Sequence, residues 1–311
     1  MKTKLAEAKF RSALGRVGQL FSLVVWLGAV ILICSSASAQ NMFVSGTDAG
    51  GGEIFKFSLA GSESIFATGL VDPWDLAVDR AGNLFVVDSQ CGELYCGAKI
   101  NKISPQGVRT IFASSLSYPS YLAVDNSGKV FVGDYDHGII YQYKPDGSRA
   151  TFASGLYHPV GMAFDSAGNL YVADNSVGDI SQGNIYKYKP DGSRVTIGVL
   201  NPGDRPADLA LDSMGNLYMA DLGGNIYRYS LSGVLRRYSR MTFGSVPNSA
   251  QSLAFDSVGN LFVVDVGDAN GRGNAIYEFT AQGARSTFAK GEALGESFLC
   301  VAFQPMQVCC Q

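Results

Sequence analysis

Short runs of alternating apolar and polar residues recur along the chain from residue 41 to residue 304. Each run is rich in Val, Ile, Phe or Tyr and is bounded by Gly, Asn, Asp or Pro, a pattern that predicts β-strands joined by tight turns. No helical periodicity of useful length follows residue 40. The clearest runs end in Asp and read LFVVD (84–88), VFVGD (130–134), LYVAD (170–174), LYMAD (217–221) and LFVVD (261–265).

These runs belong to a repeated unit with a period of roughly 40–45 residues, which is typical of a four-stranded propeller blade. An LAVD-like run and a turn such as DSAGN precede each of them, and an IYKYK-like run, a second turn and a TFAS-like run follow. The heptapeptide YKPDGSR occurs in two units, at 143–149 and 188–194. In the D-x-x-G-N turns, the Asp side chain can bond backbone amides and Gly accepts a positive φ.

The two ends of the chain predict how the ring closes. NMFV at 41–44 aligns with a second strand, and VAFQ at 301–304 aligns with a first strand that has nothing after it. One C-terminal strand and three N-terminal strands would therefore complete a sixth blade and remove the exposed edges. We predict an all-β, six-bladed β-propeller over residues 40–311, with repeats near 74–114, 120–154, 160–199, 207–239 and 251–289 and a shared blade of 41–68 plus 298–304.

Residues 1–39 have the pattern of a secretory signal peptide. Five basic residues precede a mostly apolar run at 20–33, and Ala37-Ser38-Ala39 is a small-residue cleavage site. The apolar run is shorter than the ~20 residues that a membrane-spanning helix needs, so the alternative of a retained anchor is less favoured. We expect a secreted or periplasmic, monomeric protein with no stable membrane span after cleavage.

The net charge and the cysteine and histidine content indicate which ligands, disulfides and metal sites can be expected. Removing residues 1–39 leaves 19 Lys and Arg against 26 Asp and Glu, a net charge of −7, which disfavours nucleic acid because phosphate binding needs a basic face. In an exported chain, Cys91 and Cys96 are expected to form a local disulfide, while the pairing of Cys300, Cys309 and Cys310 is open. The chain has two histidines, too few for a multi-histidine zinc site in one protomer.

Function is expected on one face of the propeller. The loops between second and third strands, and those between blades, vary in length and sequence, whereas the other turns are nearly identical; variable loops on a rigid scaffold carry function. We call the side with the variable loops the variable-loop face and the opposite side the turn face. The candidate ligand-binding residues on the variable-loop face are Trp74, Asp75, Tyr118, Tyr121, His137, His158, Arg205, Asp208 and Asn248.

Two kinds of aspartate differ in their predicted roles. Asp75 and Asp208 share one position in the unit and could bind a cation or polarise a substrate; the alternative is that each bonds local backbone. Asp88, Asp134, Asp174, Asp221 and Asp265 occur once in every unit. Because they recur identically, we expect them to stabilise the turns of each blade.

The pattern P-x-x-L-A-x-D-x-x-G-N-L-Y-V-A-D followed by I-Y-x-Y-x-x-x-G resembles the NHL repeat over nearly all of residues 41–304. Related six-bladed propellers include the SMP-30/gluconolactonase family of calcium-dependent lactonases and the strictosidine synthases. In the lactonases, Asn or Asp follows the Pro of the P-x-G-[LM]-x-x-D element as a calcium ligand. Here that position holds Trp74, Ser120, Val160 and Ala207, and only Asn248 matches.

The sequence thus predicts an exported NHL-type binding module for a carbohydrate, peptide or cell-envelope ligand, without a cofactor or catalytic residue. The alternative is a lactone or ester hydrolase with calcium held by Asp75, Asp208 and Asn248 at the channel mouth. A purely structural surface protein is a third possibility.

Overall fold

The computed structural model describes residues 22–26, 29–33, 40–48, 51–89, 98–175, 183–201, 203–232, 237–268, 273–291 and 297–305. The chain divides into two units, Met1–Ala39 and Gln40–Gln311, at the boundary expected for the signal peptide, whose removal stays a prediction. In the first unit β1 (Ser22–Trp26) pairs with β2 (Ala29–Ile33). Among the described residues, no helix is long and apolar enough to cross a membrane.

The second unit is a six-bladed β-propeller, as predicted. Its six antiparallel sheets each contain four strands, and the first strands of neighbouring blades contact one another in the order β6, β10, β14, β18, β22, β26 and back to β6. These first strands surround the central channel. They are β6 (Pro73–Val78), β10 (Pro119–Val124), β14 (His158–Phe164), β18 (Pro206–Leu211), β22 (Ala250–Phe255) and β26 (Ser297–Phe303).

The other three strands of each blade follow in chain order. Blade 1 adds β7 (Leu84–Asp88), β8 (Ala98–Ile103) and β9 (Arg109–Leu116); blade 2 adds β11 (Val130–Asp134), β12 (Ile139–Tyr143) and β13 (Arg149–Ala153); blade 3 adds β15 (Leu170–Asn175), β16 (Asn184–Tyr188) and β17 (Arg194–Val199). Blade 4 adds β19 (Leu217–Asp221), β20 (Asn225–Ser232) and β21 (Arg237–Ser245), and blade 5 adds β23 (Leu261–Asp265), β24 (Ala275–Phe279) and β25 (Arg285–Lys290).

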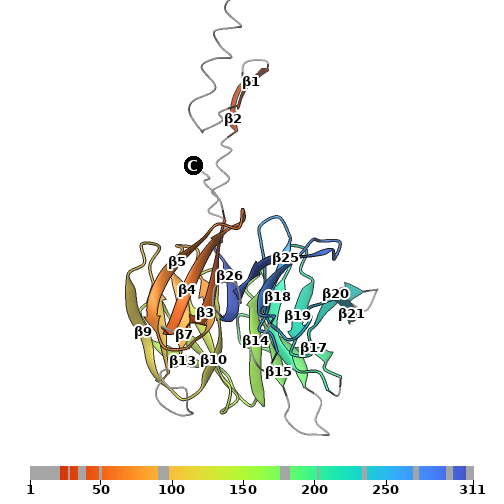
Figure 1. Cartoon of the computed structure of the whole chain (residues 1–311). Helices are drawn as coiled ribbons and strands as arrows, with labels where there is room; N and C mark the ends of the chain where they lie inside the picture. Colours follow the sequence, from red (N-terminus) through yellow and green to blue (C-terminus); the bar gives the residue numbers. More distant parts are fainter. Residues whose placement is uncertain are drawn as a thin grey trace, which may run out of the picture. The chain divides into compact units, whose positions relative to one another are not determined.

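Blade 6 is made from both ends of the domain. The C-terminal β26 pairs with β3 (Asn41–Asp48), which continues into β4 (Gly51–Ser58) and β5 (Glu63–Leu70). Figure 1 shows the blue β26 in this sheet with the red-orange N-terminal strands. The side chain of Asn41 donates to Gln304 Oε1 at 2.8 Å, and the backbone amide of Gln304 donates to the carbonyl of Asn41. The predicted closure is confirmed, and it pairs the edges that an open sheet would expose.

The core lies between blades because both faces of each second strand are covered by neighbouring sheets. All five residues of β7, β11, β19 and β23 are buried, and aromatic rings such as Phe131, Phe152 and Phe164 pack edge to face across the gap between blades. Burial of such side chains is the main source of stability in a fold of this kind.

The two predicted turn classes form as expected. In the first-to-second turns Asp side chains accept the amide of the residue four positions on, as Asp79 Oδ1 does from Asn83 at 2.8 Å, and the turn glycine has a positive φ, 82° at Gly82. These turns lie at one end of the channel and hold the first strand of each blade in register with the second.

Candidate functional site

One residue in each first strand lies at an irregularity in the β-ladder, and its identity changes from blade to blade. The register shifts just before or around this residue in all six blades. Such bulges re-aim a side chain out of the regular alternation. We call these residues the bulge ring; they are Asp75, Tyr121, Gly161, Asp208, Ser252 and Cys300.

Four members of the bulge ring form a continuous polar chain. The Cys300 thiol donates to Asp75 Oδ1 at 2.9 Å, Cys300 Sγ lies 3.2 Å from Ser252 Oγ, and the Ser252 hydroxyl donates to Asp208 Oδ2 at 2.9 Å. Asp75 and Asp208 belong to blades 1 and 4, on opposite sides of the ring. The structure therefore links the two predicted carboxylates through two side chains contributed by blades 5 and 6.

Backbone amides of the next blade also bind this chain. Leu122 N donates to Asp75 Oδ2 at 2.7 Å, Leu253 N donates to Asp208 Oδ2 at 3.0 Å, and Val301 N donates to Ser252 Oγ at 3.2 Å. Each bond joins neighbouring blades. The carboxylates consequently have a structural role as well as any chemical one, in keeping with the alternative that they bond backbone.

Burial determines the protonation states of Asp75, Asp208 and Cys300 in the bulge ring. Asp75 is only 7% exposed, and burial raises its pKa to about 6 against the hydrogen bonds from Cys300 and backbone amides. Burial, and next the charge of Asp75, raises the pKa of Asp208 to about 8. Burial also raises the pKa of the Cys300 thiol, so it remains a hydrogen-bond donor. At neutral pH the pair therefore tends to retain a proton.

The other two members of the bulge ring are Tyr121 and Gly161, its largest and smallest residues. Burial raises the pKa of the Tyr121 hydroxyl, as do Asp208 and Asp75, whereas a hydrogen bond from the Trp74 side chain lowers it. The hydroxyl is thus close to both carboxylates and stays protonated. Gly161 has a φ of 58°, and a Cβ there would lie 2.7 Å from the Cα of Asp208. Only glycine permits this close approach of blades 3 and 4.

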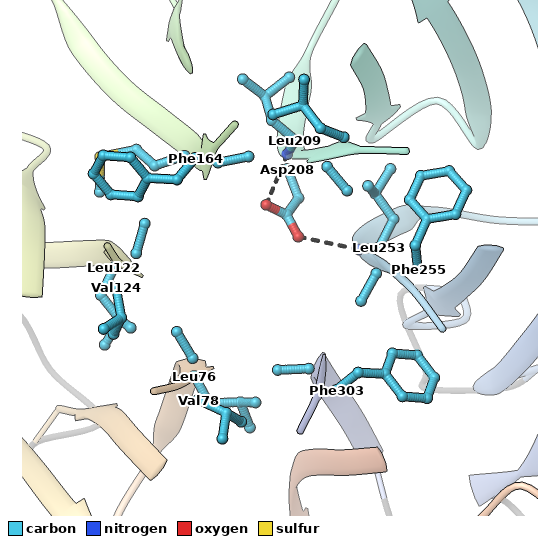
Figure 2. A pocket seen from close by; sticks show the side chains of 18 of the residues that line it. Leu76, Val78, Leu122, Val124, Phe164, Asp208, Leu209, Leu253, Phe255 and Phe303 are labelled. Carbon is cyan, nitrogen blue, oxygen red and sulfur yellow. Dashed lines mark hydrogen bonds between the residues drawn. The ribbon is translucent and has the colours of Figure 1, made fainter. Parts of the chain in front are cut away.

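Below the bulge ring, the channel forms a cavity of about 460 Å³ that is lined by the first strands of the six blades. Going from the bulge ring toward the turn face, each first strand contributes an aliphatic residue, then an alanine, then Val, Leu or Phe. Figure 2 shows the carboxylate of Asp208 directed toward the centre, with Leu76, Leu122, Leu253 and Phe303 around it. The exposed turn residues Asn126 and Ser166 line the other end.

On the variable-loop face, three half-buried rings form a row across blades 2 and 3. Tyr118 and Tyr135 have ring centroids 5.8 Å apart, and Tyr135 stacks on His158 at 4.3 Å with an interplanar angle of 19°. His158 Nδ1 lies 2.9 Å from the carbonyl oxygen of Tyr135, and Tyr135 N donates to the carbonyl of Tyr118. Tyr118 and His158 were predicted from the sequence, whereas Tyr135, which follows the blade-end Asp134, was not.

Other residues of the variable-loop face are exposed. Tyr157 is 60% exposed and Trp74 is 39% exposed. His137 Nδ1 lies 2.8 Å from Asp134 Oδ1, and this contact with the carboxylate raises the pKa of His137. The turn that carries His137 packs on the next loop, since Leu156 N donates to the carbonyl of Gly138.

The other two candidates lie at blade ends. Asn248 donates through its backbone amide and its side chain to Asp265, at 3.1 and 3.3 Å. The backbone amide of Arg205, whose side chain is exposed, donates to Asp221 Oδ2 at 2.7 Å. Neither side chain has a described hydrogen bond to the bulge ring.

The blade-end aspartates have the structural role that was expected of them. Asp88, Asp174 and Asp265 each accept two successive amides of the loop that enters their blade, and Asp221 accepts one such amide and that of Gly223. Asp134 differs, because its carboxylate accepts the amide of His137 and contacts its ring.

The described polar side chains around Asp75 and Asp208 do not make up the ligand set of a calcium ion. Calcium takes six to eight oxygen ligands. Within the described residues, no three His, Cys, Asp or Glu side chains are grouped as a metal site requires, and Asn248 is bonded to Asp265. The structure thus offers two carboxylates, not the predicted three-residue set, and this arrangement does not fit a calcium site.

The predictions for cysteine fall partly outside the described residues. Cys91, Cys96, Cys309 and Cys310 all lie there, so the expected disulfide stays a prediction. Cys300 is a buried free thiol. Together with Ser252 it was missed as a site residue, although both occupy the repeat position of Asp75 and Asp208.

Comparison with known proteins supports the six-bladed propeller fold and its likeness to the gluconolactonase propellers. The family described as strictosidine synthase-like, N-terminal, matches residues 194–229, and no curated protein matches the chain. A protein of unknown function from Bacteroides caccae is similar at a TM-score of 0.60 and 16% identity, covering 86% of this chain and 99% of that one.

Two further solved structures carry functional names. A gluconolactonase from Xanthomonas campestris is similar at a TM-score of 0.58 and 16% identity, covering 70% of this chain and 76% of that one. Virginiamycin B lyase from Staphylococcus aureus is similar at 0.51 and 17% identity, with 70% and 69% covered. The chain is a six-bladed propeller of the type seen in gluconolactonases; at these identities the likeness concerns the fold alone.

Proposed function

We propose that this protein is an exported binding module that recognises a carbohydrate through the variable-loop face. The observation that supports this most is the row of rings formed by Tyr118, Tyr135 and His158. Rings that are already stacked lose little conformational freedom on binding. Their π-faces and edges suit the polarised C–H groups of a sugar ring, and the exposed carboxylate of Asp136, next to Tyr135, can accept hydrogen bonds from hydroxyl groups.

The scaffold suits this role because the loops that carry the rings are fixed at both ends. Asp174 Oδ1 accepts the amides of Tyr157 and His158 at 2.9 and 3.0 Å, which holds the loop between blades 2 and 3. A rigid element that positions exposed aromatic side chains is the arrangement expected of a recognition surface. The NHL-like repeat pattern is compatible with such a module and remains part of the proposal.

Glycan-array screening of the full-length protein, followed by calorimetry on the best binder, tests the proposal. Tyr135→Ala should weaken binding about tenfold, the equivalent of about 1.4 kcal/mol, because it removes the central ring. Tyr277→Ala is the matched control, since Tyr277 lies under Arg285 on blade 5 and away from the row. Peptide libraries and cell-envelope fractions serve as parallel arms. Binding of peptides alone, or glycan binding unchanged in Tyr135→Ala, would refute the carbohydrate assignment.

A second candidate is a metal-dependent lactone or ester hydrolase, favoured by the carboxylates of Asp75 and Asp208 at the end of the channel. The donors described above do not complete a calcium site, so no mechanism is drawn through a metal. Calcium content by elemental analysis, with melting temperatures measured with and without EDTA, decides this alternative. One tightly held ion whose removal lowers the melting temperature would support it; metal-free protein with an unchanged melting temperature would exclude it.

A further inference from the structure

Below the bulge ring, the wall of the central channel consists of backbone groups. In blade 1, Asp79 N donates to the carbonyl of Asn83, and hydrogen-bonded pairs alternate along an antiparallel ladder. Leu76 and Val78 therefore direct their N–H and C=O groups away from β7. Since β6 is an edge strand of its sheet, these groups face the channel. The side chain of Leu76 instead belongs to the core between blades 6 and 1.

The same arrangement recurs in the other five blades, where the amide of Asp125, Asp165, Asp212, Asp256 or Gln304 forms the equivalent bond. Two layers of backbone groups therefore line the channel. The inner layer, next to the bulge ring, comprises Leu76, Leu122, Met162, Leu209, Leu253 and Val301. The outer layer, nearer the turn face, comprises Val78, Val124, Phe164, Leu211, Phe255 and Phe303. Backbone groups that are not paired in a sheet need polar partners, so this channel suits a polar occupant.

Most N–H donors of the inner layer are bonded to side chains of the bulge ring. The amides of Leu76 and Leu122 donate to Asp75, those of Leu209 and Leu253 to Asp208, and that of Val301 to Ser252. Figure 2 shows the two bonds to Asp208. The N–H and C=O groups of a strand residue point to the same side, so the carbonyl oxygens of these residues remain directed at the channel. The inner end of the channel thus presents mainly oxygen atoms, from a ring of carbonyls and two carboxylates.

The charge at the inner end has no cationic partner among the described residues. Asp75 and Asp208 line the cavity, whereas no described Lys, Arg or His does so. The groups described as bonded to the two carboxylates are amides, a hydroxyl and a thiol, all of them neutral. A carboxylate removed from water is costly unless a proton or a cation compensates it. A pair that retains one proton still carries one negative charge, which one monovalent cation balances.

The cavity of about 460 Å³ opens on the turn face, because its lining includes the exposed residues Asn126 and Ser166 and no residue of the loops between blades. Asp165 also lines the opening, but Lys187 Nζ lies 3.2 Å from its Oδ2. The uncompensated charge is therefore at the inner end. An ion that enters from the turn face passes the outer layer, whose N–H and C=O groups can bind the water around it.

We propose that the inner end of the channel binds one weakly hydrated monovalent cation, potassium or ammonium, beside Asp75 and Asp208 and the carbonyls of the inner layer. Rings of backbone carbonyls can replace the water around potassium. The site differs from the calcium site considered above in its ligands, most of which are backbone oxygens, and in the charge of the ion. It is also separate from the aromatic row, so that either site could exist without the other.

Thermal unfolding of the full-length protein, freed of divalent ions with EDTA, tests the site. KCl should raise the melting temperature relative to choline chloride at the same ionic strength, and the rise should saturate, because an ion that binds only the folded state stabilises it by mass action. Choline is the control for ionic strength, since its methyl groups prevent coordination by carbonyls. RbCl should act as KCl does, and NaCl should need about tenfold higher concentrations because sodium holds its water more tightly.

Ammonium chloride distinguishes the two possible occupants. A larger rise in melting temperature with ammonium than with potassium would show that directed N–H bonds to the oxygens matter, and would assign the site to ammonium. A smaller rise would assign it to potassium. Either result supports a site for a monovalent cation.

Two variants that lose the same charge locate the ion. Asp208→Asn removes a carboxylate at the inner end and should weaken the affinity for potassium about tenfold. Asp136→Asn removes an exposed carboxylate on the variable-loop face and should leave the potassium effect unchanged. Each variant is compared with itself in choline chloride, so that a change in its basal stability does not enter the comparison.

Crystals grown in RbCl give a direct readout, because anomalous scattering should place one rubidium ion in the channel beside Asp75 and Asp208. Equal melting temperatures in KCl and choline chloride would overturn the proposal. An equal potassium effect in Asp208→Asn and the unchanged protein, or rubidium only outside the channel, would do so as well. Stabilisation by calcium without any by potassium would also overturn it, and would support the metal-dependent alternative instead.

Discussion

Two sets of aspartates in this propeller are built on different principles. The blade-end residues Asp88, Asp174, Asp221 and Asp265 repeat in identity and position, and each accepts the amides of a loop in its own blade. Asp75 and Asp208 occupy a repeat position that holds a different residue in each of the other four blades. They are joined through Ser252 and Cys300 across other blades. A repeated residue here maintains the blade, whereas a position that breaks the repeat marks the centre where blades meet.

The largest effect should come from removing a blade-end carboxylate. Asp265 is fully buried and accepts the amides of Asn248, Ser249 and Gly267. Asp265→Ala leaves these donors without a partner, so we expect a loss of about 4 kcal/mol in the free energy of unfolding. Urea denaturation measures it. Asp136→Ala, on an exposed turn, is the control, with an expected change within about 0.5 kcal/mol. Similar losses in both variants would contradict the structural role.

The next effect concerns the contact that only glycine allows in the bulge ring. A Cβ at Gly161 meets backbone atoms of Asp208 and Leu209 within 3 Å, while a Cβ at Gly215 meets nothing within 4 Å. Both glycines have a positive φ. Gly215→Ala should therefore cost about 1 kcal/mol of strain, and Gly161→Ala about 3 kcal/mol because blades 3 and 4 must separate as well. Thermal and urea unfolding of the two variants compare them; equal losses would mean that the blades separate freely.

The central pair, Asp75 and Asp208, should lower the stability of the protein as the pH rises, so that its removal is stabilising. The folded-state pKa values of Asp75 and Asp208, about 6 and about 8, lie above the unfolded value near 4. The folded protein thus binds more protons between these values, and stability from this pair falls as pH rises from about 4 to about 8. Asp208→Asn removes one of the two carboxylates and its repulsion with the other, and so reduces this loss of stability. Its melting temperature should exceed that of the unchanged protein at pH 8 and show little gain at pH 5.

That experiment also distinguishes the central pair from the blade-end set. In Asp265→Asn, an oxygen that accepts two hydrogen bonds becomes an NH2 donor, so its melting temperature should fall at both pH values. Asp208→Asn also loses an acceptor, but it removes one charge of the central pair. A gain for Asp265→Asn at pH 8, or a fall for Asp208→Asn, would remove the distinction drawn here. Asp75→Asn should resemble Asp208→Asn with a smaller gain, since its pKa is raised less.

The fold could be predicted in detail because it is repeated. Strands, turns, six blades and the closing strand all follow from a pattern sampled five times in the chain, in which chance matches average out. The pairing of Asp75 with Asp208 could be suspected from their shared repeat position. The connection through Ser252 and Cys300 could not be read from loops alone, because it depends on bulges that turn one residue of each first strand toward the centre.

The aromatic row of Tyr118, Tyr135 and His158 was also predicted only in part from the sequence. Tyr118 and His158 lie in loops that precede first strands and were found from that position. Tyr135 lies in a short turn after a blade-end Asp, in a place that carries no repeated signal. Its stacking on His158 depends on how the turn of blade 2 packs on the loop of blade 3, a contact between segments that no sequence period relates.

The smallest expected effect answers why YKPDGSR is written twice. Its first and last residues meet across the turn: Arg194 Nη1 donates to the Tyr188 hydroxyl at 3.4 Å, and its guanidinium lies 4.3 Å from the ring centroid of Tyr186. In the other copy, the guanidinium of Arg149 lies 4.7 Å from the ring centroid of Tyr141. Arg194→Ala should cost about 0.5–1 kcal/mol, and Arg80→Ala, an exposed arginine in another turn, should cost less.

A double-mutant cycle separates the two contacts of Arg194. Tyr188→Phe removes only the hydroxyl, so its coupling to Arg194→Ala reports the hydrogen bond, and Tyr186→Leu reports the stacking. We expect about 0.5 kcal/mol of coupling in each arm, measured by urea denaturation. Coupling to neither tyrosine would mean that the turn is held by its Pro-Asp-Gly backbone alone and that the repeated Arg serves solubility. Coupling to Tyr188 would make the heptapeptide a self-contained clamp, which explains why it recurs with its two ends unchanged, whereas coupling to Tyr186 alone would mean that the clamp depends on the strand before it.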